Sequence, residues 1–106
     1  MTPLPTTFAA LGNATRLAIV ERLLAEGELA AGDLLDAAEV SPPAMSRHFK
    51  VLREAGIVVQ RVDKQRRMYS VQPEAVQAIG EWVLNFREFW AGSLDRLDMA
   101  LREDET

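Results

Sequence analysis

Residues 41–56, S-P-P-A-M-S-R-H-F-K-V-L-R-E-A-G, have the pattern of one short helix with two different faces. Ser41 can cap the start of this helix, Pro42 suits its first position, and Gly56 is a stop signal. The apolar side chains between these ends recur at spacings of four and three and make one stripe: Met45, Phe49 and Leu52. The segment therefore predicts a helix that buries this stripe and exposes its opposite face.

The predicted exposed face of this helix combines small, hydroxyl and cationic side chains. They are Ala44, Ser46, Arg47, Lys50 and Arg53. Such a face can lie closely against a grooved polyanion, and DNA is the leading candidate. The alternative is a solvated surface helix, of which an Arg- and Lys-rich face is also typical.

Residues 58–71, V-V-Q-R-V-D-K-Q-R-R-M-Y-S-V, consist of two β-branched runs around a basic, polar centre. This pattern predicts a hairpin with its tip at residues 63–66. A helix-turn-helix followed by a basic hairpin is a winged helix. Lys64, Gln65 and Arg66 are then candidates to touch the minor groove or its phosphates, while Tyr69 and Val71 are expected to face the core.

Three further helices are expected before residue 41. Thr6 or Thr7 can cap a short first helix that carries Phe8 and Leu11 and ends at Gly12. Asn13 is a suitable cap for a helix that ends near Gly27. Residues 28–40 should contain the first helix of the helix-turn-helix, packed through Leu34, Leu35 and Ala38.

Three segments of the chain resemble the ArsR-type (ArsR/SmtB) winged helix-turn-helix repressors. Residues 41–58 are similar to the recognition-helix signature of that family, residues 10–23, A-L-G-N-A-T-R-L-A-I-V-E-R-L, to its upstream motif, and residues 66–71 to the return strand of its wing. The similarity covers roughly residues 8–100. It implies a homodimeric repressor that binds double-stranded DNA at a palindromic operator.

The side-chain chemistry and the family resemblance together indicate which residues bind DNA. Pro42 stands where the family most often has Gln, which leaves base readout to depend more on Ser46 and Arg47. Arg16 matches a family arginine, and either a structural contact or a phosphate contact would explain it. The expected DNA-binding residues are Ser41, Pro43, Ala44, Ser46, Arg47, His48, Lys50, Arg53, Lys64, Gln65 and Arg66.

The net charge of −4 by itself argues against a nucleic-acid partner, but the charges are unevenly distributed along the chain. Residues 41–71 contain seven of the 12 Lys and Arg and two of the 16 Asp and Glu, a net charge of +5. The other residues hold five cations and 14 acids, a net charge of −9. This separation allows one face to meet phosphates while the rest of the protein repels them.

After Pro73, apolar residues at alternating spacings of three and four predict one long helix over residues 73–102. Four of the seven aromatic residues fall between positions 82 and 90, more apolar surface than a small winged helix can cover. We therefore expect a two-fold dimer interface; packing of this helix onto its own domain is the alternative. Its expected residues are Val76, Ile79, Trp82, Val83, Phe86, Phe89, Trp90, Leu94 and Leu97.

Metal and catalytic sites are not expected. The chain has no cysteine and one histidine, and Ala30 and Gly32 stand where the family's metal-sensing members have thiolates. No nucleophile motif, phosphate loop or carboxylate pair indicates an enzyme. We expect no cofactor and no metal, and a cytoplasmic protein, because no signal peptide or apolar run of membrane-spanning length is present.

The sequence thus predicts one domain, residues 1–106, that is mostly α with a small β-hairpin: a winged helix-turn-helix with a long C-terminal dimerisation helix. Two other functions stay open. The basic face could bind an acidic protein partner, which would make the chain a protein-interaction module. Alternatively, the aromatic cluster at residues 82–90 could line a small-molecule pocket near the dimer interface. An inducer or protein antagonist, if there is one, is not indicated by these residues.

Overall fold

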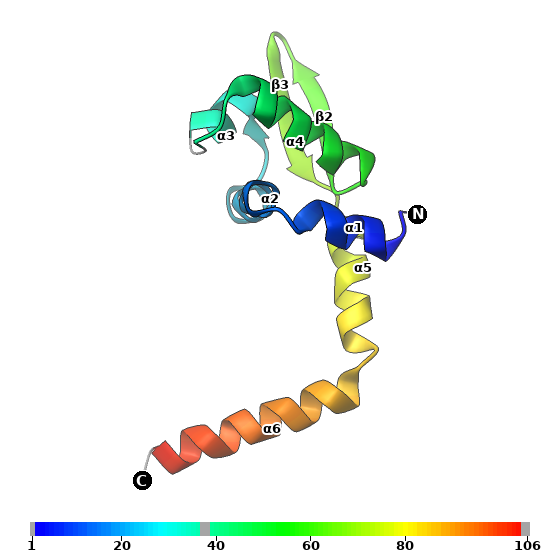
Figure 1. Cartoon of the computed structure of the whole chain (residues 1–106), viewed down its shortest axis with the longest axis vertical. Helices are drawn as coiled ribbons and strands as arrows, with labels where there is room; N and C mark the ends of the chain where they lie inside the picture. The colour runs from blue at the N-terminus through cyan, green and yellow to red at the C-terminus, as the bar shows by residue number, and fades with distance from the viewer. Residues whose placement is uncertain (1, 37–38, 105–106) are drawn as a thin grey trace. The chain divides into compact units, whose positions relative to one another are not determined.

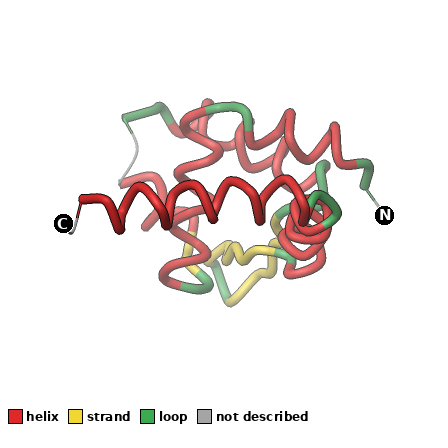
Figure 2. The backbone as a smooth tube through the Cα atoms, turned by 90° about the horizontal axis from the view of Figure 1, so that it is seen from below, coloured by secondary structure: helices red, strands yellow, loops and turns green. Residues whose placement is uncertain are grey.

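The structure is a computed structural model that describes residues 2–36 and 39–104. It is mostly helical, with its strands confined to one small sheet (Figures 1 and 2). In chain order the elements are α1 (Leu4–Leu11), α2 (Ala14–Glu26), β1 (Leu29–Ala30), α3 (Ala31–Asp36), α4 (Pro42–Glu54), β2 (Val58–Asp63), β3 (Arg66–Val71), α5 (Pro73–Leu84) and α6 (Arg87–Asp104).

The chain forms two compact units, and the boundary between them along the chain lies within α5. The first extends to Val76 and contains the sheet together with α1 to α4. The second begins at Gln77 and contains the rest of α5 and all of α6. Only the first unit has a buried core among the described residues.

The core of the first unit is built around the predicted apolar stripe of α4. Met45, Phe49 and Leu52 are all buried, and Leu52 is fully inaccessible to solvent. They pack with apolar residues from α1, α2, α3, the sheet and the connection between α4 and β2: Ala10, Ile19, Val20, Leu23, Leu34, Ala55, Ile57, Val58 and Tyr69. The predicted amphipathic helix is therefore confirmed. Of the residues expected to pack from the preceding helix, Leu34 is buried and Leu35 is partly buried against the core, while Ala38 lies outside the described residues.

Local capping explains where α2 and α4 begin and end. The expectation that Thr6 or Thr7 caps the first helix was wrong, because α1 already begins at Leu4, with Pro3 as its N-cap and no side-chain cap. The Ser41 hydroxyl accepts a hydrogen bond from the Ala44 amide at 3.4 Å, and the Asn13 side chain accepts one from the Arg16 amide at 3.1 Å. Gly27 and Gly56 follow α2 and α4 with φ angles of 83° and 73°. Glycine adopts this left-handed conformation without steric cost, so both helices end at the predicted positions.

The predicted hairpin is present as β2 and β3, and it gains a third strand. The antiparallel sheet has the order β1-β3-β2, with Tyr69 opposite both Leu29 and Gln60. β1 has only two residues, too few to give a sequence pattern. At the tip, φ is 60° at Lys64 and is not positive at Gln65, as in a type II′ turn without its usual glycine.

The prediction of one helix over residues 73–102 was wrong in one respect. A long C-terminal helix is present as α6, but it is separated from α5 by a turn at Asn85 and Phe86. The Phe86 amide donates to the carbonyl oxygen of Val83, three residues back, at 3.2 Å, so the regular four-residue spacing is lost there. Asn favours such breaks because its short polar side chain competes for backbone groups.

We predict that Gly56→Ala lowers the free energy of unfolding by about 1–2 kcal/mol, because alanine at a positive φ is strained. Gly80→Ala is the matched control, since Gly80 lies inside α5 and a Cβ there would meet nothing within 4 Å. That substitution should be neutral or stabilising by up to about 1 kcal/mol. Urea unfolding of both variants is the measurement, and equal effects would contradict the role given to Gly56.

Candidate nucleic-acid interface

α4 exposes a polar and cationic face opposite its buried stripe. Ser46, Arg47, Lys50 and Arg53 are all exposed along the helix. Ser41 and Pro43 are exposed at its start, whereas Ala44 and His48 are half-buried. A face of this kind can approach a groove closely, because Ala44 and Ser46 are short, while the long cationic side chains can extend to groups beside them.

The cations of this face are largely uncommitted. The side chains of Arg47 and Arg53 make no hydrogen bond or ion pair with any residue that the structure describes. Lys50 lies 4.0 Å from Glu54, but both side chains are 69% exposed, so this pair contributes little. The guanidinium and ammonium groups are therefore available to phosphates or base edges.

His48 is held by a contact with Arg16 on α2. The Arg16 Nε donates to the carbonyl oxygen of Ala10 at 2.6 Å, and its Nη1 lies 3.3 Å from His48 Nδ1. Since arginine has no acceptor, Nδ1 must accept and the imidazole proton must be on Nε2. Burial lowers the pKa of His48 below its ordinary value of 6.5, and the charges of Arg16 and Arg47 lower it further. Arg16 thus has a structural role in joining α1, α2 and α4.

The wing is fixed to α4 by an aromatic stack. The rings of Phe49 on α4 and Tyr69 on β3 have centroids 4.1 Å apart and an interplanar angle of 15°. The Tyr69 hydroxyl also donates to Gln60 Oε1 at 3.2 Å, which joins the two wing strands. Tyr69 faces the core as predicted, and Val71 is partly buried against it.

The wing tip presents the predicted polar residues. Lys64, Gln65 and Arg66 are exposed, and Lys64 has no ion pair within the described part of the chain. Arg66 Nη2 lies 3.5 Å from Asp33 Oδ2 on α3. Nearer the base of the wing, Arg61 binds both carboxylate oxygens of Glu28, at 2.7 and 2.6 Å. The hydrogen bonds from Arg61 lower the pKa of Glu28.

Arg67 is a candidate that the sequence assignment left out. It is exposed and, within the described residues, has no hydrogen bond or ion pair. It is two residues from Tyr69 on β3, so both side chains leave the same face of the sheet. Together with Ser46 of α4 it lines a cavity of about 170 Å³. The alternation of β3 around Tyr69 would have placed Arg67 on the α4 side.

α5 and α6 expose most of the residues predicted for the dimer interface. Neither α5 nor α6 buries any described residue in the single chain. Ile79 and Val83 are half-buried, and the other seven are exposed by 38–63%: Val76, Trp82, Phe86, Phe89, Trp90, Leu94 and Leu97. Edge contacts join Trp82 to Phe86 and Phe89 to Trp90, with centroids 5.4 and 5.1 Å apart.

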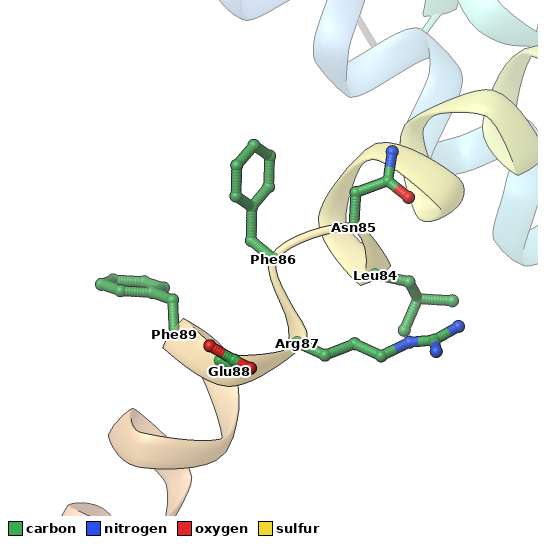
Figure 3. A pocket seen from close by; sticks show the side chains of 6 residues that line it. All are labelled: Leu84, Asn85, Phe86, Arg87, Glu88 and Phe89. Atoms are coloured by element: carbon green, nitrogen blue, oxygen red, sulfur yellow. The ribbon is translucent and has the colours of Figure 1, made fainter.

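The break between α5 and α6 leaves a hollow of about 550 Å³ (Figure 3). Its lining consists of six consecutive residues, 84–89, from the end of α5 to the start of α6, and no other described part of the chain lines it. In the close view Phe89 and Arg87 extend in opposite directions, and Phe86 points away from both. The hollow therefore has no enclosed site for a small molecule in the single chain.

Known proteins resemble this chain over most of its length. A family model described as a helix-turn-helix domain matches residues 11–61. The HTH-type transcriptional regulator Rv2034 of Mycobacterium tuberculosis is 42% identical over 87 residues, which cover 82% of this chain and 78% of that protein. The arsenic resistance transcriptional regulator ArsR1 of Pseudomonas putida is 37% identical over 103 residues, 94% of this chain and 79% of that one. The chain belongs to the ArsR family of helix-turn-helix transcriptional regulators.

The fold agrees with this family. The crystal structure of the ArsR family transcriptional regulator RHA00566 matches with a TM-score of 0.73, over 86% of this chain and 97% of that one, at 23% identity. The predicted fold class and the prediction of a DNA-binding transcriptional regulator are thus confirmed. None of the described helices combines the length and the apolar composition needed to cross a membrane.

We predict that His48 makes the free energy of unfolding of this protein depend on pH. The unfolded chain takes up the imidazole proton at its ordinary pKa of 6.5, whereas the folded protein takes it up at lower pH. Neutral His48 therefore contributes stability above pH 6.5, and the contribution is lost as the pH falls through the folded pKa.

Urea unfolding between about pH 8 and pH 5 tests this, because wild type should lose stability relative to His48→Gln. His48 is the single histidine, so NMR titration of its ring gives the pKa directly. Arg16→Ala should raise that pKa by removing a nearby positive charge. Parallel unfolding curves, or an unchanged pKa in the Arg16 variant, would contradict the contact.

Proposed function

We propose that this protein is a homodimeric repressor that binds a palindromic operator and does not respond to metals. The observation that carries the proposal is the exposed cationic face of α4, which lies opposite a fully buried stripe. A helix anchored on one side and cationic on the other can enter a major groove without disturbing the core.

The residues of the interface divide into two roles. Ala44, Ser46 and Arg47 are assigned to base edges, and Ser41, Pro43 and His48 to the groove wall, where His48 Nε2 can donate to a phosphate. Lys50, Arg53 and the wing tip at residues 64–66 are assigned to phosphates. Contacts of the first kind carry sequence information, whereas those of the second kind set position and affinity.

We predict that Arg47→Ala weakens binding to the preferred site by about 1–3 kcal/mol and relaxes base preference. Lys64→Ala should instead weaken binding to all sequences alike and reduce the salt slope by about one unit. Mobility shifts on preferred and random duplexes at several salt concentrations separate the two. If both variants lose affinity without regard to sequence, the assigned roles are wrong.

A dimer is proposed because of the exposed apolar side chains of the second unit. Burying one large aliphatic or aromatic side chain contributes about 1.5–3 kcal/mol, and α5 and α6 leave many of them exposed. Two-fold symmetry would also present two α4 helices to two half-sites, which is how short recognition helices reach specific affinity. Because α5 and α6 are separate helices, the proposed interface consists of two helices from each subunit rather than one continuous helix.

We predict that Leu94→Glu gives a monomer that loses operator binding although every DNA-facing residue is intact. Leu94 is 63% exposed within the regular part of α6, whereas Phe86 lies in the turn, where a substitution would also alter the break. A charge at this position would enter a two-fold interface twice.

Met99→Glu is the matched control. Met99 is 61% exposed on the same helix but, five residues after Leu94, it lies on a different side. This variant should remain dimeric and bind DNA. Light scattering gives the mass, and a wild type that is monomeric, or equal masses for the two variants, would show that this surface is not the interface.

Metal independence is proposed from the residues at the family's thiolate positions. Ala30 is buried in β1 opposite Met68, and Gly32 lies in α3, so neither supplies a ligand atom. No catalytic role is proposed. We propose the cytoplasm as the location of this protein, because a regulator that binds an operator must be in the compartment that holds the DNA.

A further inference from the structure

Two arginines of the wing, Arg61 and Arg66, are paired with carboxylates of the same chain, and the two pairs differ in kind. Arg61 and Glu28 form a bidentate pair at 2.6–2.7 Å. Arg66 and Asp33 form a single contact at 3.5 Å, and their side chains are 62% and 49% exposed. Bidentate pairs hold a fixed geometry, whereas a single exposed contact is weak and exchanges readily.

The backbone of Asp33 is held by Arg22 of α2. The Arg22 Nη1 donates to the Asp33 carbonyl oxygen at 2.7 Å, and Arg22 itself is paired with Glu26 at 2.6 Å. Asp33 also lies in the first turn of α3, where a carboxylate is electrostatically favoured. The backbone of Asp33 is thus anchored, whereas the Arg66 guanidinium is at the end of a long exposed side chain that can move.

The space around Arg66 allows that movement. A cavity of about 390 Å³ lies between the start of α3 and residues 65–67 of the wing, and Asp33 and Arg66 both line it. Arg66 can therefore leave Asp33 without a steric barrier from the described residues.

We propose that Asp33 is an affinity-setting residue that holds Arg66 in the free protein and is replaced by a DNA phosphate in the complex. The inference rests on the proposed wing contact with DNA. Because phosphate contacts carry no sequence information, Asp33 lowers affinity for all DNA alike and leaves base preference unchanged. Glu28 keeps Arg61 at the base of the wing, and Arg61 is not a DNA contact.

The test uses binding of the whole protein to a duplex of random sequence, for which phosphate contacts dominate affinity. Asp33→Asn should increase affinity about two- to fivefold, the range that an exposed ion pair can reach. Asp33→Glu keeps the charge and should stay close to wild type. Glu21→Gln is the matched control, because it removes the same charge from an exposed side chain of α2 that has no hydrogen bond or ion pair with any described residue.

A double-mutant cycle isolates the pair from general electrostatics. In an Arg66→Ala background, Asp33→Asn should give no increase in affinity. A gain that persists without Arg66, or an equal gain from Glu21→Gln, would overturn the inference and attribute the effect to net charge. An Asp33→Asn variant with wild-type affinity would overturn it as well.

Failure of the wing assignment gives a different result. If Arg66→Ala alone binds the random duplex as tightly as wild type, Arg66 does not contact phosphate. If Arg66→Ala weakens binding but Asp33→Asn does not strengthen it, the wing contact stands and the inference about Asp33 fails. Circular dichroism of each variant establishes that the compared proteins are folded.

Discussion

The stack between Phe49 and Tyr69 is the contact on which the proposed DNA-binding surface depends. It joins α4 to β3 at a centroid distance of 4.1 Å, with both residues at least 96% buried. The helix and the wing are thereby fixed as one body, so the cations on α4 and those on the hairpin keep a constant spacing. A groove and its flanking phosphates also have a constant spacing, and a rigid surface can match it without ordering cost at the moment of binding.

The electrostatic design follows from the same arrangement. Residues 41–71 concentrate positive charge, yet two acids from outside this segment, Glu28 and Asp33, reach its arginines. The protein therefore does not present its full positive charge to DNA. Arg47, Arg53, Lys64 and Arg67 are left without ion pairs among the described residues, and they form the uncommitted part of the surface. This balance favours moderate phosphate affinity, which leaves base contacts to decide where the protein binds.

Features set by neighbouring residues could be predicted from the sequence. The cap at Ser41, the stop at Gly56 and the stripe through Phe49 are local, so they defined α4 to within two residues. The hairpin was predicted for the same reason. β1 and the pair between Arg61 and Glu28 join residues more than 30 positions apart, and nothing local signals such contacts. The turn at Asn85 was missed because the apolar spacing continues across it. The spacing of apolar residues gives no information on whether each backbone hydrogen bond is formed.

The central claim is that two copies of this surface read one symmetric site. The most direct measurement is selection of DNA fragments from a random pool by the purified protein, followed by sequencing of the bound fraction. The account predicts an inverted repeat whose half-sites are about one helical turn apart, 10–10.5 base pairs or a multiple of that distance. Enrichment of a single asymmetric half-site, or no enrichment over the starting pool, would contradict it.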